Sequence, residues 1–159
     1  MNFASKTSAL CLGTVILATA SFAASHSDKA AAAAVEARHA QMGLIAYHTG
    51  ILGGMAKGEA DYDADLARAA ATNLHAAASM APATMWLEGT EQGAIDGSRA
   101  KPEVWSDAAG FADRLNALQM ASAAMIDAAA TDLDSLKTAM GDVGKACGAC
   151  HDDYRGPKN

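Results

Sequence analysis

Several features are scarce in this sequence, and each scarcity excludes a class of protein. Lysine and arginine number 12 against 18 aspartates and glutamates, without a basic cluster, which argues against nucleic-acid binding. No apolar run reaches the roughly 20 residues that a membrane-spanning helix needs. Aromatic residues make up only 5% of the chain, whereas alanine, the best helix former, is abundant. The composition favours an all-α domain whose acidic surface suits a basic partner protein.

The N-terminal residues have the pattern of an export signal. Lys6 supplies a positive charge, residues 9–20 form a short apolar stretch, and Ser21 and Ala23 provide the small side chains of a cleavage site. We expect a signal peptide over residues 1–23, since the apolar stretch is too short for a retained anchor. The remaining residues 24–159 then form one exported, periplasmic domain.

Apolar residues recur at three- and four-residue steps over four segments, which predicts four helices. We expect these helices at about residues 30–56, 63–80, 103–129 and 132–154, after a frayed start at residues 24–34. Asp61 or Asp63 is expected to cap the second helix, and Thr131 or Asp132 the fourth. A long connection over residues 83–101 suggests a crossover or a functional loop. Four amphipathic helices of these lengths predict an antiparallel four-helix bundle.

The chemistry of the chain is concentrated near its C-terminus. Cys147, Cys150 and His151 form the pattern Cys-x-x-Cys-His, which is typical of covalent haem attachment. Two thiols three residues apart on a helix lie on one side and can both reach the vinyl groups of one porphyrin. His151 is then placed to bind the iron as the proximal ligand. The pattern predicts one haem c near the C-terminal end of the fourth helix.

Three other uses of the two cysteines compete with haem attachment. A thioredoxin-like redox pair needs a strand–helix–strand context, which this chain does not suggest. A zinc site needs further clustered cysteine or histidine ligands, but the other histidines are isolated. A structural disulfide is the third alternative, because exported proteins commonly contain them. All three fit the pattern less well than haem does.

The ending GDVGKACGACHDDYR, residues 141–155, resembles the C-terminus of the class II c-type cytochromes, the cytochrome c′ and c-556 family. Residues 56–63 resemble that family's first interhelical loop, and residues 101–107 resemble the start of its third helix. Arg38 and Met42 resemble its arginine-x-x-x-ligand pattern on the first helix. The resemblance covers nearly all of the chain after residue 23, and it implies a haem inside a four-helix bundle.

The resemblance also implies roles for individual residues. Arg38 and Arg155 match arginines near the haem propionates or the haem edge, and a guanidinium fork suits a carboxylate. Met42 matches the position distal to the iron. The resemblance further implies redox partner proteins and often a homodimer through the first two helices.

Met42 determines which function we expect. If its thioether binds the iron, the haem is six-coordinate and suited to carrying single electrons. If Met42 only packs against the haem, the open iron can bind nitric oxide or carbon monoxide, for gas scavenging or tolerance. Ordinary core packing of a methionine is the simplest alternative. We expect electron transfer first and gas binding second. We expect no enzyme, because no distal acid–base residue is evident beside Met42.

The remaining candidates are expected to have structural roles. His48 and His39 are predicted to be exposed, and His75 to be a hydrogen-bonded histidine beside the core. Trp86 and Trp105 are predicted to be packing residues. Met120 and Met125 are expected on or near the apolar stripe of the third helix, which lines the haem pocket in the family that the chain resembles.

Overall fold

The computed structural model describes residues 19–158 of the chain, and their side chains from residue 28 onward. Most of the predicted signal peptide, residues 1–18, lies outside the described residues, and its removal stays a prediction. Within the described part, no strand forms, and no helix combines the length and the apolar character needed to cross a membrane.

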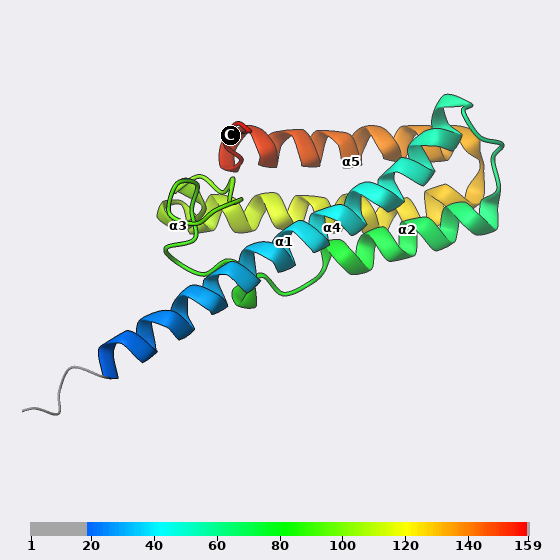
Figure 1. Cartoon of the computed structure of the whole chain (residues 1–159). Coiled ribbons are helices and arrows are strands. Elements are labelled where there is room, and N and C mark those ends of the chain that lie inside the picture. The colour runs from blue at the N-terminus through cyan, green and yellow to red at the C-terminus, as the bar shows by residue number, and fades with distance from the viewer. Residues whose placement is uncertain (1–18, 159) are drawn as a thin grey trace, which may run out of the picture.

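Four long helices make the bundle, and two short ones lie in the connection between α2 and α4. The long helices are α1 (Thr19–Lys57), α2 (Ala64–Ala78), α4 (Ala108–Thr131) and α5 (Leu133–Tyr154), and the short ones are the 3-10 helix η1 (Pro82–Thr84) and α3 (Glu103–Ser106). Consecutive long helices run in opposite directions, and α1 extends beyond the others at its N-terminal end (Figure 1). This arrangement confirms the predicted antiparallel four-helix bundle.

Two predicted boundaries are wrong. The first helix begins at Thr19 rather than near residue 30, because no proline or glycine lies between Thr19 and Gly43 and alanine-rich sequence favours the helix. The predicted third helix is divided at Asp107, whose backbone leaves the helical region at φ −124° and ψ 55°. The Asp107 carboxylate instead accepts a hydrogen bond from the Gly110 amide and caps α4.

The second and fourth predicted helices are each capped by one of the two residues predicted for that role. Asp63 accepts a hydrogen bond from the Leu66 amide at 2.9 Å, at the start of α2. Asp132 accepts one from the Ser135 amide at 2.7 Å, at the start of α5. Each carboxylate satisfies an amide that has no partner inside its helix, so each fixes where the helix begins.

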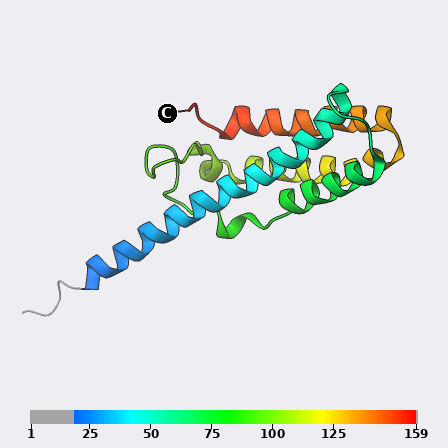
Figure 2. The ribbon, with the colours of Figure 1, turned by 45° about the vertical axis from the view of Figure 1, so that its right-hand side comes forward.

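The main core fills the end of the bundle where α1 turns into α2 and α4 turns into α5. Its fully buried side chains come from all four long helices and include Leu52, Leu74, Met125, Leu136 and Val143. At this end α1 packs directly on α5, whereas toward the C-terminus of α5 the two helices separate (Figure 2). A second, smaller cluster around Ala100, Val104, Phe111 and Tyr154 lies at that other end.

The connection between η1 and α3 is folded back on itself and on the C-terminal residues. Ser98 donates a hydrogen bond from its hydroxyl to the Thr90 carbonyl at 2.6 Å, and both residues are buried. The Gly156 amide donates to the Arg99 carbonyl at 2.7 Å, and Ala100 pairs with Arg155 in an antiparallel bridge. The connection therefore closes the bundle beside the end of α5.

Candidate functional site

The Cys-x-x-Cys-His pattern lies in the last two turns of α5. Cys147 and Cys150 are half-buried free thiols, and His151 is half-buried beside them. Cys147 packs against the main core cluster, and Cys150 packs against the cluster around Phe111 and Tyr154. The two thiols therefore lie at the junction of the two clusters, on the part of α5 that α1 leaves uncovered.

Burial sets the protonation of these groups. It raises the pKa of the Cys147 thiol, and it raises that of Cys150 together with the nearby Cys147. Burial also lowers the pKa of His151, and the charges of Arg155 and Arg99 lower it further. A neutral imidazole keeps a lone pair available for a metal ion. The site thus presents two protonated thiols and one neutral imidazole side by side.

The geometry weakens the three competing uses of the cysteines. Both thiols are free rather than disulfide-bonded. The described residues contain no strand for a thioredoxin-like unit and no group of three or more histidine, cysteine, aspartate or glutamate side chains arranged to hold a metal ion. The arrangement fits a group that needs two thiols and a single protein nitrogen at this place.

The register of α1 against α5 bears on where Met42 lies relative to His151. A Cβ atom on Gly53 of α1 would lie 3.6 Å from the Met140 methyl group of α5, which fixes one point of contact. Met42 precedes Gly53 by eleven residues, and His151 follows Met140 by eleven residues. Eleven residues are about three helical turns, or about 16 Å, so each pair shares one face of its helix. Because α1 and α5 run in opposite directions (Figure 1), equal spacing from this contact places Met42 and His151 on the same side of it along their helices.

Arg38 lies one turn before Met42 and is almost completely buried, at 4% exposure. Its Nη2 donates a hydrogen bond to the Thr90 carbonyl at 3.1 Å, and its guanidinium stacks over the Trp86 ring at 4.8 Å. Its Nη1 is buried without a partner among the described residues, and burial lowers the pKa of the guanidinium. A buried cationic donor without an acceptor is costly, so the site fits a ligand that brings a carboxylate here, as a haem does.

Arg155 lies on the surface at the end of α5. It is exposed and forms the C-cap of α5, where its amide donates to the His151 carbonyl. Its charge acts on His151 and Cys150 by lowering their pKa values. Its predicted haem contact therefore stays a prediction, which rests on proximity rather than on a bond.

Several other expectations can be compared with the structure. His75 donates to or accepts from the Ser122 hydroxyl at 3.1 Å, as predicted for a histidine beside the core. His39 is exposed as expected, but His48 is half-buried with its Nδ1 shielded and unpartnered, so the prediction of an exposed His48 is wrong. Met125 is fully buried, but Met120 is 66% exposed and does not line the site.

The hydrogen bonds of two buried side chains beside the site were not predicted. Gln41 donates from Nε2 to the Ala77 carbonyl at 2.9 Å and so joins α1 to the end of α2 one residue before Met42. Tyr154 donates to the Asp107 carboxylate at 2.7 Å, three residues after His151. A polar residue at an apolar helical step is the signal for Gln41, and an aspartate just before an apolar-periodic segment is a capping signal for Asp107.

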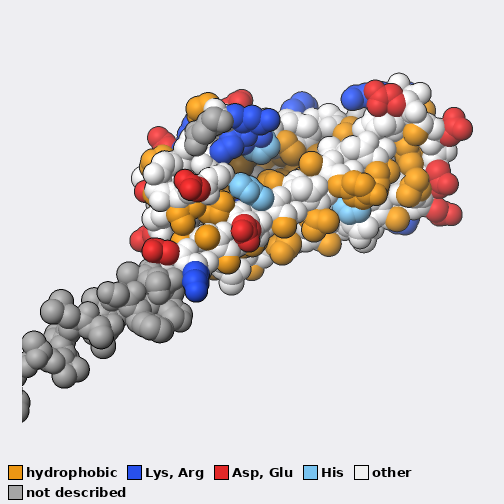
Figure 3. Space-filling model, viewed as in Figure 1, with side chains coloured by type: hydrophobic (Ala, Val, Ile, Leu, Met, Phe, Trp, Pro, Cys, Tyr) orange, Lys and Arg blue, Asp and Glu red, His pale blue; other side chains and the backbone are white. Residues whose placement is uncertain are grey.

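One face of the molecule shows how the site is composed. Hydrophobic side chains run along the surface between α1 and α5, and histidine side chains lie next to lysine and arginine side chains toward the end where the C-terminus lies (Figure 3). An apolar strip with positive charge at one end is a suitable surface for a flat apolar group that carries carboxylates.

Comparison with known proteins identifies the family. The family model described as Cytochrome C′ matches residues 33–155. Cytochrome c-554 of Cereibacter sphaeroides is 45% identical over 121 residues, covering 76% of this chain and 79% of the relative. Cytochrome c′ of the same species is 40% identical over 121 residues, covering 76% and 81%. The solved structure of cytochrome c′ from Rhodobacter sphaeroides superposes with a TM-score of 0.78 at 38% identity, covering 80% of this chain and 98% of that one.

Fold, thiols and histidine together define a helical-bundle c-type cytochrome with one haem. The chain belongs to the cytochrome c′ family, and its cofactor is a covalently attached haem c. The resemblance noted from residues 141–155 and from Arg38 and Met42 is confirmed at the level of the family.

Proposed function

We propose that this protein carries single electrons between redox partners, with its haem bonded to Cys147 and Cys150 and its iron held between His151 and Met42. The observation that supports the proposal is the contact between Gly53 of α1 and Met140 of α5, since Met42 and His151 lie eleven residues from it on antiparallel helices. Histidine and methionine on opposite sides make a closed six-coordinate site, which suits electron transfer without ligand exchange.

The haem, when bound, supplies an iron that accepts and releases one electron. The chain's own residues determine how it is held. The two half-buried thiols provide the points of covalent attachment, and the imidazole of His151, kept neutral by burial, provides a nitrogen. The side chain of Met42 is half-buried and packs against the core, so its thioether could bind the iron with little further loss of conformational freedom.

The buried positive charge of Arg38 also supports a haem at this place. Its unpartnered Nη1 can donate to a haem propionate while Nη2 stays bonded to Thr90 and the ring of Trp86 stays beneath the guanidinium. The new bond would offset the cost of burying the cation. Trp105 donates from Nε1 to the Trp86 carbonyl at 3.2 Å and holds that platform in place.

The location and partners follow from the same proposal. Haem c attachment and the signal-like residues 1–23 suit an exported, periplasmic protein. The net charge of −6 favours a basic redox partner through electrostatic steering. Leu44 and Tyr47 of α1 and Leu66 of α2 are 51%, 65% and 49% exposed, and these apolar side chains suit a homodimer through the first two helices.

Gas binding is the second candidate function. The solved structures similar to this chain include a nitric oxide complex of a mutant of cytochrome c prime from Alcaligenes xylosoxidans, with 40% identity and a TM-score of 0.69. If Met42 only packs beside the haem, nitric oxide or carbon monoxide could bind the iron on that side.

Absorption spectra of the haem-loaded protein separate the two candidates. We expect a sharp low-spin spectrum of the reduced protein that carbon monoxide does not change. Met42→Ala should open the iron and produce a high-spin spectrum that shifts with carbon monoxide. Met140→Ala is the matched control, because Met140 is also half-buried and packs on the same core, three turns from His151. A wild-type spectrum that is already high-spin and sensitive to carbon monoxide would contradict electron transfer and support gas binding.

A further inference from the structure

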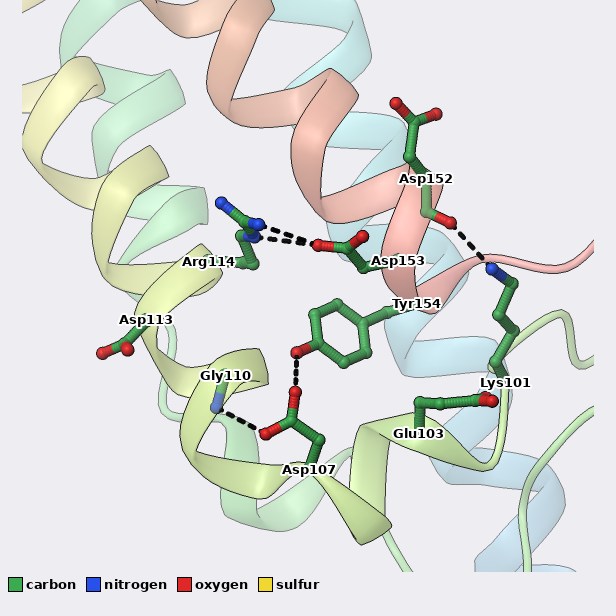
Figure 4. Close-up of a pocket in the computed structure, with 9 residues that line it drawn as sticks. All are labelled: Lys101, Glu103, Asp107, Gly110, Asp113, Arg114, Asp152, Asp153 and Tyr154. Atoms are coloured by element: carbon green, nitrogen blue, oxygen red, sulfur yellow. Dashed lines mark hydrogen bonds and ion pairs between the residues drawn. The ribbon is translucent and has the colours of Figure 1, made fainter.

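The last turn of α5 carries His151 and is tied to the start of α4 by one short hydrogen bond. Tyr154, three residues after His151, is buried at 6% exposure, and its hydroxyl donates to Asp107 Oδ2 at 2.7 Å. The other oxygen of Asp107 accepts from the Gly110 amide at 3.2 Å, so one carboxylate serves both helices. Figure 4 shows the Tyr154 hydroxyl pointing at Asp107 from α5 across to the α3–α4 junction.

Helix ends fray because their last carbonyls lack partners within the helix. Here the end is held by several bonds from other elements. Lys101 donates from its amide to the Tyr154 carbonyl at 3.0 Å and from Nζ to the Asp152 carbonyl at 2.7 Å. Arg114 of α4 approaches Asp153 at 2.9 Å through Nη2. The Arg114–Asp153 pair is half-exposed, and exposed ion pairs contribute little to stability. The bond from Tyr154 to Asp107, in contrast, is donated by a buried side chain.

The ring of Tyr154 is held independently of its hydroxyl. It meets Phe111 edge-on with centroids 5.2 Å apart, and Phe111 meets Trp86 edge-on at 4.8 Å. Trp86 in turn lies under Arg38 at 4.8 Å. A contiguous stack thus joins the α5 end to the arginine beside Met42. Removing only the hydroxyl should leave this stack in place.

Gly110 is required for the same bond. A Cβ atom at this position would collide with Asp107 Oδ2 and with the Tyr154 hydroxyl. The other glycines of α4 and α5 differ from Gly110 in this respect. A Cβ atom would meet no atom within 4 Å at Gly141, Gly144 or Gly148. The sequence thus keeps this space free for the two oxygens.

We propose that Asp107 and Tyr154 are positioning residues for His151. Their hydrogen bond fixes the last turn of α5 against α4 and thereby fixes the distance and angle at which the imidazole meets the iron. This inference rests on the proposed assignment of His151 as the proximal ligand. It adds that the geometry of that ligand is set from α4 rather than by the attachment motif alone.

The test compares Tyr154→Phe with Tyr62→Phe in the haem-loaded protein. Tyr62 is the matched control, since its hydroxyl donates a part-buried hydrogen bond of 2.9 Å to the Ala129 carbonyl in the main-core half of the bundle. We expect Tyr154→Phe, but not Tyr62→Phe, to change the reduction midpoint potential and to broaden the reduced absorption spectrum. Hydrogen exchange of the amides in the last turn of α5 should rise at least about tenfold, as loss of a hydrogen bond to a charged group implies.

Variants of Asp107 and Gly110, each with a matched control, test the same hydrogen bond from its other side. Asp107→Ala should shift the potential in the same direction as Tyr154→Phe, and the double variant should shift it no further, because both changes remove one interaction. Asp132→Ala controls for loss of a helix cap, as Asp132 caps α5 in the way that Asp107 caps α4. Gly110→Ala leaves both partners intact but forces them apart, and Gly141→Ala controls for an added methyl group in a helix.

The amount of covalent haem per chain, measured as the pyridine haemochrome, separates this inference from the function on which it rests. Wild-type protein without covalent haem would refute the proposed function and this inference with it. Normal covalent haem in every variant, together with a potential and spectrum of Tyr154→Phe equal to those of Tyr62→Phe, would refute the positioning role alone.

Discussion

The two ends of the bundle differ in how completely the protein's own side chains fill the interior. At the end where Gly53 meets Met140, the core is filled by side chains without exposure, such as Leu52 and Leu136. Toward the end that carries His151, α1 and α5 separate, and the cysteines and the histidine are only half-buried. Close packing is the rule inside proteins, so the difference marks where a further group belongs.

Polar groups show the same asymmetry. The described residues contain four buried side-chain atoms without a hydrogen-bond partner, and all belong to one stretch of α1: Arg38 Nη1, Gln41 Oε1, His48 Nδ1 and Thr49 Oγ1. Buried polar atoms are nearly always paired, so four exceptions within twelve residues need an explanation. The stretch precedes Gly53, the residue of α1 that lies next to Met140 of α5. The unpartnered polar atoms thus support the proposed place of the haem at the second end.

The largest effect should come from His151→Ala. We expect the haem to stay covalently attached but to lose its proximal ligand, with loss of the native spectrum and of reversible one-electron reduction. Absorption spectra and voltammetry measure both. His39→Ala, at an exposed histidine of α1, is the control and should leave the spectrum unchanged. A native spectrum in His151→Ala would place the ligand elsewhere.

Truncation of a core side chain at the end of the bundle far from His151 should lower stability and leave the haem spectrum unchanged. Leu136→Ala removes a fully buried side chain and should cost about 2–5 kcal/mol of unfolding free energy, measured by urea denaturation. The haem spectrum of the folded variant should equal that of the wild type, because Leu136 lies about four turns from His151. An altered spectrum with little loss of stability would contradict the division between the two ends.

Arg38→Met should have a smaller, electrostatic effect. The methionine keeps apolar contact with Trp86 but removes a buried positive charge beside the haem. Loss of that charge favours the oxidised iron, so the midpoint potential should fall. The unfolding free energy should change by only about 1 kcal/mol, because relief of the desolvation cost offsets the hydrogen bonds that are lost. Arg68→Met, which breaks an exposed pair with Asp127, should change neither quantity measurably. An unchanged potential in Arg38→Met would remove Arg38 from the site.

The smallest effects should appear at extremes of pH. The hydrogen bond to Asp107, burial and the negative charges of Asp107 and Asp153 raise the pKa of Tyr154 to about 12 from an ordinary 10, although Arg114 acts in the opposite direction. A raised pKa stabilises the fold below pH 10, and this contribution is lost as the pH rises through about 12. Urea midpoints of the wild type should therefore fall across this window more steeply than those of Tyr154→Phe.

At acid pH, the stability due to this pair should fall as the pH is lowered. The hydrogen bond from Tyr154, followed by that from the Gly110 amide, lowers the pKa of Asp107 below its ordinary value of 3.8. Its contribution is present above that value and is lost as the pH falls through the lowered pKa. Equal pH dependence of wild type and Tyr154→Phe on both sides would show that the pair contributes nothing to stability.

Local patterns predicted much of this structure. Three- and four-residue periodicity indicated the long helices, aspartates marked the starts of α2 and α5, and the spacing of Cys147, Cys150 and His151 indicated the haem site. Each of these signals is contained within a few neighbouring residues. Spacing within a helix also indicated that Arg38 and Met42 share a face, whereas their expected roles at the haem came from the family resemblance.

Relations between distant segments were not predictable in this way. Tyr154 and Asp107 are 47 residues apart, and nothing in either local sequence indicates the other. The break between α3 and α4 depends on Asp107 turning its carboxylate to Gly110 rather than continuing the helix. The burial of His48 depends on how α1 lies against its neighbours, which the periodicity of α1 alone does not define.

The most direct test of the account is the amount of covalent haem on purified protein, measured by intact-mass spectrometry and the pyridine haemochrome. We expect one covalent haem on the wild type and none on the double variant Cys147→Ser, Cys150→Ser, with each single variant lacking one of the two bonds. A double variant that still carries covalent haem, or a wild type with both thiols free after haem loading, would contradict the assignment of these cysteines.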